Sequence, residues 1–207
     1  MSSNFLVFNF FYFLSVVSTL GYGFYINNLL VSKNVDLDYG TKGLIGIFIL
    51  TIYSIFSHFF ISHSFIHNSI LFFLGIILFI FFFKFNYKKK DFKIVCLVFI
   101  LLLIAFFCFK THDDFPYYHF PYTNYLTKSD IIIGVGNYDP SWRSPSSIFY
   151  LNSLFYLPIV KYYSYHIGAL LIMGYSLSIL CIKMFHRYNL KNFDQLFFYK
   201  LLSFTFI

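Results

Sequence analysis

The hydrophobic positions of this chain gather in long runs that are separated by short polar segments. A transmembrane helix needs about 20 apolar residues, each adding about 1.5 Å of rise. Five runs reach or approach that length, and a shorter sixth run closes the chain. They are residues 5–31, 44–61, 66–83, 94–109 and 163–182, with a partial span at 193–207. We therefore expect an all-α, polytopic transmembrane bundle in which residues 1–207 form a single domain.

A β-barrel is the other architecture that can cross a bilayer, and the pattern argues against it. Barrel strands alternate apolar and polar residues over segments of about ten residues, and these runs do not alternate. The partial span at 193–207 has 15 residues and is too short for a full crossing. We interpret it as a sign that the chain is the N-terminal part of a longer protein.

The basic residues predict how the bundle is oriented. Five lysines fall in the connection 84–93, and lysine-rich connections lie in the cytoplasm. Counting crossings from there puts the basic connections 33–42 and 183–191 on the same side. The one long connection, residues 110–162, is then predicted to be extracytoplasmic.

Composition changes the class of protein that needs to be considered. With 59% hydrophobic residues, 11% charged residues and a mean hydropathy of +0.71, the chain is neither a soluble globular domain nor a disordered one. The net charge of +7 could indicate nucleic-acid binding, but the basic residues lie between apolar runs and follow membrane topology instead. The predicted partner is the lipid bilayer, and no nucleic acid.

Candidate chemistry concentrates in the connection 110–162, because long connections tend to carry function. Asp113 and Asp114 follow directly after the fourth apolar run. Adjacent carboxylates near lipid are costly unless they hold a cation, share a proton or face water. They are candidates for a general base or for ligands of a divalent metal cation, with His119 as a further polar partner. The alternative is helix capping and turn formation before Pro116.

The rest of this connection contains two aromatic-rich segments, 116–127 and 147–158, that are too short to span a bilayer. We expect two interfacial or re-entrant helices there. Between them, residues 134–137 predict a tight turn rather than a nucleotide-binding loop, because the third glycine of that motif is absent. Arg143 is a candidate phosphate ligand, and its alternative role is a solvated pair with Asp139.

Three histidines, His58, His63 and His67, flank the other predicted outer turn. His63 and His67 have the i, i+4 spacing of two metal ligands on a helix. No acidic residue accompanies them, and the turn is expected to break the helix between them. We therefore interpret the three as interfacial residues.

An acid pair at a membrane exit, followed by two interfacial segments, resembles the multi-spanning glycosyltransferases of the GT-C class. The likeness is carried by residues 113–117 (DDFPY), 114–121 (DFPYYHFP), 134–137 (GVGN) and 143–151 (RSPSSIFYL). It is closest to uncharacterised bacterial membrane proteins grouped with the dolichyl-phosphate-mannose-type transferases. The acid pair departs from the family pattern by following the fourth apolar run rather than the first.

The resemblance implies an enzyme of the bacterial inner membrane that moves a sugar from a polyprenyl-phosphate donor to an envelope glycan or a lipid-linked acceptor. Asp113 or Asp114 would act as base or hold a divalent metal cation, and Arg143 would hold the leaving phosphate. The remaining substrate-binding candidates are Tyr117, His119 and Asn137. Two alternatives stay open, which are a transporter or flippase subunit for lipid-linked glycans and a non-catalytic membrane assembly protein.

Overall fold

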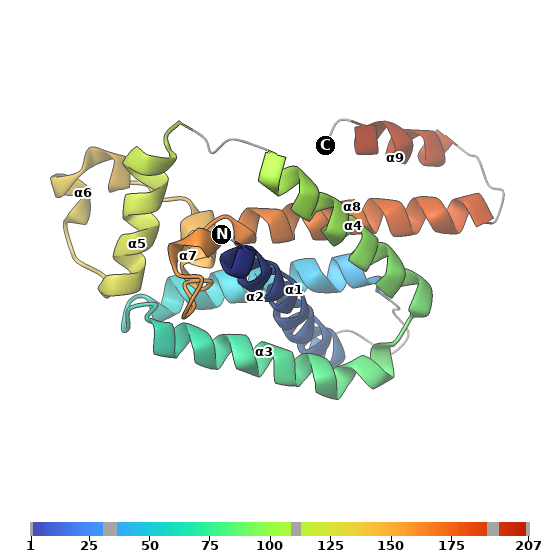
Figure 1. The fold of residues 1–207 in the computed structure, drawn as a ribbon, viewed down its shortest axis with the longest axis horizontal. Coiled ribbons are helices and arrows are strands. Elements are labelled where there is room, and N and C mark those ends of the chain that lie inside the picture. The colour runs from blue at the N-terminus through green and yellow to red at the C-terminus, as the bar shows by residue number, and fades with distance from the viewer. Residues whose placement is uncertain (1, 31–36, 109–112, 190–194, 206–207) are drawn as a thin grey trace.

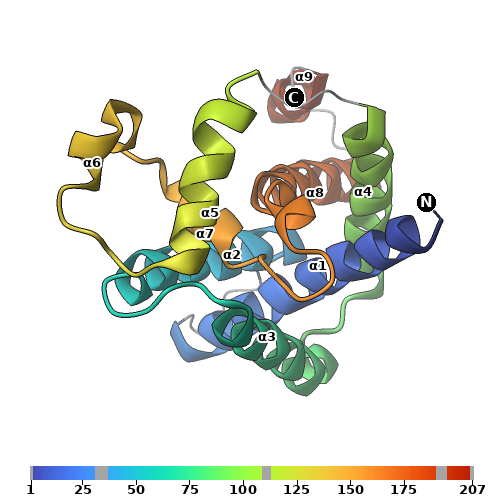
Figure 2. The ribbon, with the colours of Figure 1, turned by 60° about the vertical axis from the view of Figure 1, so that its left-hand side comes forward.

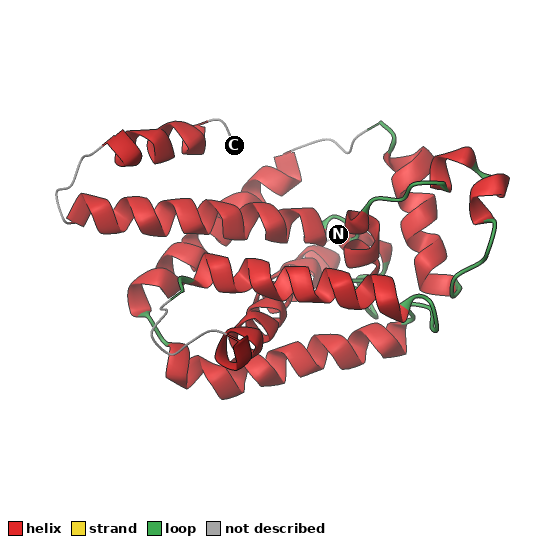
Figure 3. Ribbon diagram, turned by 180° about the vertical axis from the view of Figure 1, so that it is seen from behind, coloured by secondary structure: helices red, strands yellow, loops and turns green. Residues whose placement is uncertain are grey.

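The structure, a computed structural model, describes residues 2–30, 37–108, 113–189 and 195–205. Within those ranges every regular element is a helix, which confirms the predicted all-α class (Figure 1; Figure 3). The long helices are α1 (Ser2–Leu30), α2 (Tyr39–Ser57), α3 (Phe65–Asn86), α4 (Lys89–Cys108) and α8 (Ile167–Asn189). The short ones are η1 (Phe115–His119), α5 (Phe120–Lys128), α6 (Val135–Tyr138), η2 (Pro140–Trp142), α7 (Ser147–Ser153), η3 (Tyr162–Ser164) and α9 (Gln195–Thr205).

Four helices are long and apolar enough to cross a membrane, and they indicate an integral membrane protein. The four candidate spans are Phe5–Leu30, Tyr39–His58, Phe65–Phe85 and Tyr162–Tyr188, counted among the described residues. They correspond to four of the five predicted runs. The predicted run 94–109 also forms a helix, α4, but this helix begins with charged residues and is not among the four. Within the run 193–207, α9 accounts for 11 residues.

The long helices pack against one another through α1, α2 and α8, while the short helices gather at one end of the molecule. α1 packs against α2 and α3, and α8 packs against α2 and α4. Figures 1 and 2 show α1 crossing the other long helices obliquely, with α5, α6 and α7 together at one end. We call residues 113–164, which carry these short helices, the connecting region.

Two glycines set the close crossing of α1 and α3. A Cβ atom added at Gly21 would overlap the backbone carbonyl of Gly75 in α3. At the same crossing, the Ser18 hydroxyl donates to the Phe72 carbonyl at 3.0 Å. Small residues are typical of helix contacts in membranes, where close backbone approach replaces the missing hydrophobic driving force.

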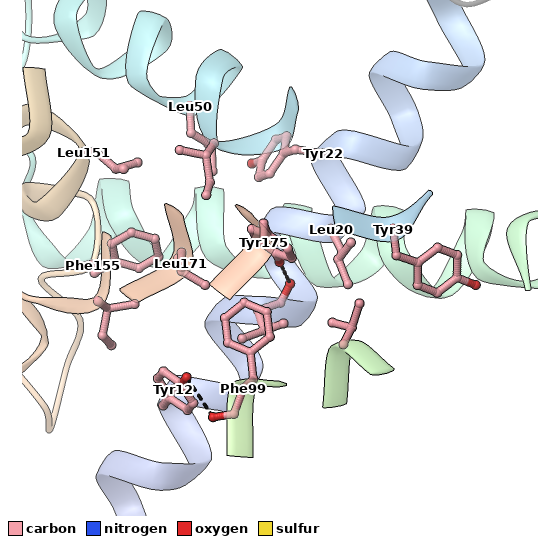
Figure 4. Packing of buried hydrophobic residues seen from close by; sticks show 14 of the residues in the cluster. Tyr12, Leu20, Tyr22, Tyr39, Leu50, Phe99, Leu151, Phe155, Leu171 and Tyr175 are labelled. Atoms are coloured by element: carbon pink, nitrogen blue, oxygen red, sulfur yellow. Dashed lines mark hydrogen bonds between the residues drawn. The ribbon is translucent and has the colours of Figure 1, made fainter. Parts of the chain in front are cut away.

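The core of the bundle combines aromatic packing with tyrosine hydroxyls that donate to backbone carbonyls (Figure 4). The Tyr12 hydroxyl donates to the Phe99 carbonyl at 3.0 Å, and the Tyr175 hydroxyl donates to the Val16 carbonyl at 2.8 Å. The rings of Phe99 and Tyr175 meet edge to face with centroids 5.0 Å apart. Each hydroxyl is therefore satisfied without water, as an apolar interior requires.

The connecting region contains the two predicted short helices. The segment predicted at 116–127 is helical as η1 followed by α5, and the one predicted at 147–158 is helical only through α7. After α7 the chain turns sharply, with positive φ angles at Ile159 (74°) and Lys161 (47°). The predicted tight turn at 134–137 is confirmed, since Gly134 has a left-handed φ of 87° and begins the single turn of α6.

Candidate functional site

The acid pair lies on the surface at the start of η1. Both side chains are exposed, and Asp114 is the residue that precedes the first turn of η1. The backbone carbonyl of Asp114, rather than its carboxylate, accepts the N–H groups of Tyr118 and His119 at 2.9 and 3.4 Å. The Asp114 side chain therefore does not cap η1, while residues 113 and 114 do form a turn before Pro116.

His119, at the end of η1, lines a small cavity of mixed polar and apolar lining between the connecting region and α8. This cavity of about 380 Å³ has walls from η1, α5, α7 and the start of α8. Its polar lining includes His119, His166, Asn152 and Thr123. The His119 ring packs on Phe149, with centroids 5.1 Å apart, and is half-buried. The cavity therefore offers hydrogen-bonding groups within reach of a ligand at the surface of η1.

A second cavity, of about 600 Å³, opens beside the first and is mainly apolar. It is lined by phenylalanines from the start of α1, the end of α4 and η1, and by residues 159–166. Phe115 and His166 line both cavities, and their rings are 4.3 Å apart. Because Asp114 immediately precedes Phe115, the acid pair lies next to the wall that the two cavities share.

Arg143 and Asn137 lie elsewhere in the connecting region, on the α6–η2 segment. The Arg143 Nε donates to the Gly136 carbonyl at 3.1 Å, and both Arg143 and Asn137 are exposed. The Asp139 carboxylate instead accepts from the Ser141 hydroxyl and backbone N–H, at 2.6 and 2.9 Å, and these bonds lower the pKa of Asp139. The hydrogen-bond donor to the Asp139 carboxylate in the described part of the chain is thus Ser141 and not Arg143.

The predicted site thus falls into two groups. Asp113, Asp114, Tyr117 and His119 share one short segment, although Tyr117 is 82% exposed and lines neither cavity. The other group, the Arg143 segment, is not joined to them by a hydrogen bond or ring contact between described residues. Across the described ranges, no three His, Cys, Asp or Glu side chains come together as metal ligands.

A buried histidine network lies on the other side of α5 and α7. His63 is fully buried, and its Nδ1 lies 2.5 Å from the Ser153 hydroxyl while its Nε2 lies 3.1 Å from the Ser57 hydroxyl. Burial, and then the neighbouring His58 and His67, lower the pKa of His63 to about 3. As predicted, the helix breaks between the histidines, because His63 precedes α3 and His67 lies in its first turn.

Two neighbours complete this network. The Asn68 side-chain amide donates to the carbonyls of His63, Ser153 and Tyr156 at 2.8 to 3.0 Å. His58 is 1% exposed, and neither of its ring nitrogens has a hydrogen-bond partner in the described part of the chain. The depth of these histidines in a bilayer stays a prediction, but His58 and His63 lie inside the protein rather than on its surface.

A comparison with protein families matches nearly the whole chain. The model of a family described as "Domain of unknown function (DUF8201)" matches residues 5–207. The chain belongs to this family. No curated protein and no solved structure matches it.

In this DUF8201 chain, His166 belongs to the candidate site, although the sequence did not indicate it. It lies at the start of the fifth apolar run, where it looks like an interfacial residue. The only sequence signal was its position, one residue before a helix that follows a long connection. Its neighbours in space, Phe115 and His119, are about 50 residues away in the chain, so only the fold brings them together.

Proposed function

We propose that this chain is a membrane glycosyltransferase that moves a sugar from a polyprenyl-phosphate donor to an envelope glycan or a lipid-linked acceptor. One observation carries the proposal, which is that the helix following the acid pair forms the common wall of two cavities, and that the smaller cavity has more polar side chains in its lining than the larger one. A lipid-linked sugar has the same division, with a polar sugar phosphate joined to a hydrocarbon tail.

The apolar cavity is suited to the first part of the isoprenoid tail. Its volume of about 600 Å³ falls in the usual range for ligand pockets, and phenylalanines from three elements line it. The lining also includes residues of two candidate membrane spans, Phe5–Leu30 and Tyr162–Tyr188, so a tail held there would continue into lipid. The sugar would then lie toward the smaller cavity, near His119 and His166.

In the proposed reaction Asp113 or Asp114 takes the proton of the acceptor hydroxyl. The acceptor oxygen attacks the anomeric carbon, and the bond from that carbon to the phosphate oxygen breaks with its electron pair on the phosphate. The leaving phosphate needs positive charge or hydrogen-bond donors. Arg143 is our candidate for this role because its hydrogen bond to Gly136 uses Nε and not the two Nη groups, although Arg143 lines neither cavity.

The test is sugar transfer by variants of the acid pair. In membranes supplied with a radiolabelled polyprenyl-phosphate sugar, Asp113→Asn, Asp114→Asn or the double variant should lower transfer at least about 100-fold, the low end for loss of a general base. Asp130→Asn removes another exposed acid of the same connecting region and should leave transfer unchanged. Undiminished transfer by the double variant would remove the mechanism and favour a non-catalytic assembly protein.

The orientation of the chain is a second requirement. Reporter fusions at residue 88 and residue 130 should report the cytoplasm and the extracytoplasmic side, respectively. The reverse result would separate the acid pair from a donor presented at the outer face of the membrane.

A further inference from the structure

Two further cavities lie next to each other, away from the candidate site, and their combined lining is polar at one end and apolar at the other. The first, of about 740 Å³, lies between the α2–α3 turn and the end of α5, and the second, of about 560 Å³, runs along the face of α3. Ile66 and Ile70 line both, so one continues into the other. Figure 2 shows the lower end of α5 beside the loop that joins α2 and α3.

The lining of the two cavities changes from polar to apolar along this path. The polar side chains of the first are Ser62, Ser64, His67, Lys128, Ser129 and Asp130. The second is lined almost entirely by apolar residues of α3, of which Ile70, Phe73 and Ile77 are each more than 60% exposed. Of the four candidate spans α3 is the least covered by protein, with 17% of its apolar window buried against 39–44% for the others. This face of α3 is therefore the one most available to lipid.

Backbone hydrogen bonds fix the turn that carries Lys128 and Asp130, the two charged residues at the polar end. The Ser129 N–H donates to the Tyr125 carbonyl, and the Ile131 N–H donates to the His58 carbonyl, both at 3.1 Å. The Tyr125 hydroxyl donates to the Asp130 carbonyl at 3.1 Å. In the described part of the chain no hydrogen bond or ion pair occupies the Lys128 ammonium or the Asp130 carboxylate. A fixed turn thus presents one free cation and one free anion two residues apart, an arrangement that lowers the entropic cost of binding.

We propose that these two cavities bind one bilayer phospholipid with a zwitterionic amine headgroup, of the phosphatidylethanolamine class. Lys128 pairs with its phosphate, Asp130 pairs with its ammonium, and the serine hydroxyls add hydrogen bonds. One acyl chain follows α3 past Ile70 and Phe73. A zwitterion matches one cation beside one anion, whereas an anionic headgroup would leave Asp130 facing like charge. This site is independent of the proposed sugar transfer.

Lipid retention tests the assignment. The purified protein is incubated with equal amounts of phosphatidylethanolamine and phosphatidylglycerol that carry the same acyl chains, and bound lipid is counted by native mass spectrometry. The wild type should retain phosphatidylethanolamine about fivefold over phosphatidylglycerol, the ratio expected from one exposed charge pair. Asp130→Asn should bring the ratio to about one or lower, and Lys128→Gln should reduce retention of both lipids.

Matched variants distinguish recognition of the lipid headgroup from binding of the acyl chain along α3. Asp139→Asn and Lys161→Gln change one acid and one lysine of the connecting region that lie outside both cavities, so they should retain lipid like the wild type. Ile70→Trp fills the shared wall and should lower retention of both lipids without changing their ratio. Equal retention of the two lipids by the wild type, preference for phosphatidylglycerol, or an unchanged ratio in Asp130→Asn would overturn the proposal. Circular dichroism confirms that each variant keeps its helices.

Discussion

The helical bundle and the connecting region are built by different means. In the bundle, hydroxyl groups such as those of Tyr12 and Ser18 donate to backbone carbonyls of a neighbouring helix, and glycines let the backbones touch. In the connecting region, short helices are joined by packed aromatic rings, and buried imidazole and amide groups attach them to α2 and α3. Long helices satisfy their own backbones, whereas short ones leave many carbonyl groups that side chains must satisfy.

Asn68 should therefore be the residue on which attachment of the connecting region depends most. Asn68→Leu removes the amide that donates to three carbonyls. The carbonyls of His63 and Tyr156 then lose this donor, while the Ser153 carbonyl keeps the backbone N–H of Tyr156 at 3.2 Å. We expect a loss of about 3 kcal/mol in unfolding free energy. Thermal unfolding in detergent would measure it, with Asn28→Leu on the exposed face of α1 as control. Equal melting temperatures for the two variants would contradict this role.

The bundle should be most sensitive where α1 and α3 cross. Gly21→Ala places a methyl group against the Gly75 carbonyl, a backbone atom that cannot rotate away. Overpacking of this kind costs about 2 kcal/mol. The same unfolding measurement applies, with Gly136→Ala in the connecting region as comparison, because the atoms near Gly136 belong to the flexible Arg143 side chain and its Cα. A smaller loss of stability in Gly21→Ala than in Gly136→Ala would show that α1 and α3 are not in close backbone contact at Gly21.

Acid should weaken the connecting region before the bundle. His63 has a pKa of about 3 in the folded protein, below the value of about 6.5 in the unfolded chain. Its neutral form is therefore the one that the fold stabilises, so this stabilisation is complete above pH 6.5 and is lost as the pH falls toward 3. The slope is about 1.4 kcal/mol per pH unit, or about 2 kcal/mol at pH 5.

Hydrogen exchange between pH 7 and pH 5 would locate this loss. Amides of α5 and α7 should lose protection ahead of those of α1. The variant His63→Gln should flatten the pH dependence of stability, whatever its stability at pH 7. An unchanged slope would assign the effect to other groups.

The smallest expected effect concerns the aromatic cluster of the connecting region. Tyr122→Phe removes a hydrogen bond of 3.0 Å between the hydroxyls of Tyr122 and Tyr150. We expect a loss of about 1 kcal/mol. Tyr138→Phe, at a side chain that is 87% exposed, should be silent in the same assay. A larger effect at Tyr138 would mean that its hydroxyl has a partner outside this chain.

The placement of the acid pair was predictable, while the division of the candidate site was not. The sequence places two carboxylates between an apolar run and Pro116, and in the structure they lie at the start of a helix. Nothing in the order of residues indicates that His119 shares a cavity with His166 while Arg143 packs on Gly136. Those pairings depend on how the short helices pack. Aromatic residues are so frequent in this chain that many different packings would bring rings together, so the sequence does not indicate which one forms.

The apolar runs alone determined that this chain is helical and where most of its long helices lie, because unpaired backbone groups are too costly in lipid. Tertiary structure decided which polar groups meet. His63 lies just before α3 and Asn68 near its start, whereas Ser153 lies in α7, and only this convergence makes His63 a buried hydrogen-bonding group rather than an interfacial one. Hydrophobicity acts on each segment separately, whereas a hydrogen bond between distant residues exists only after the segments have packed.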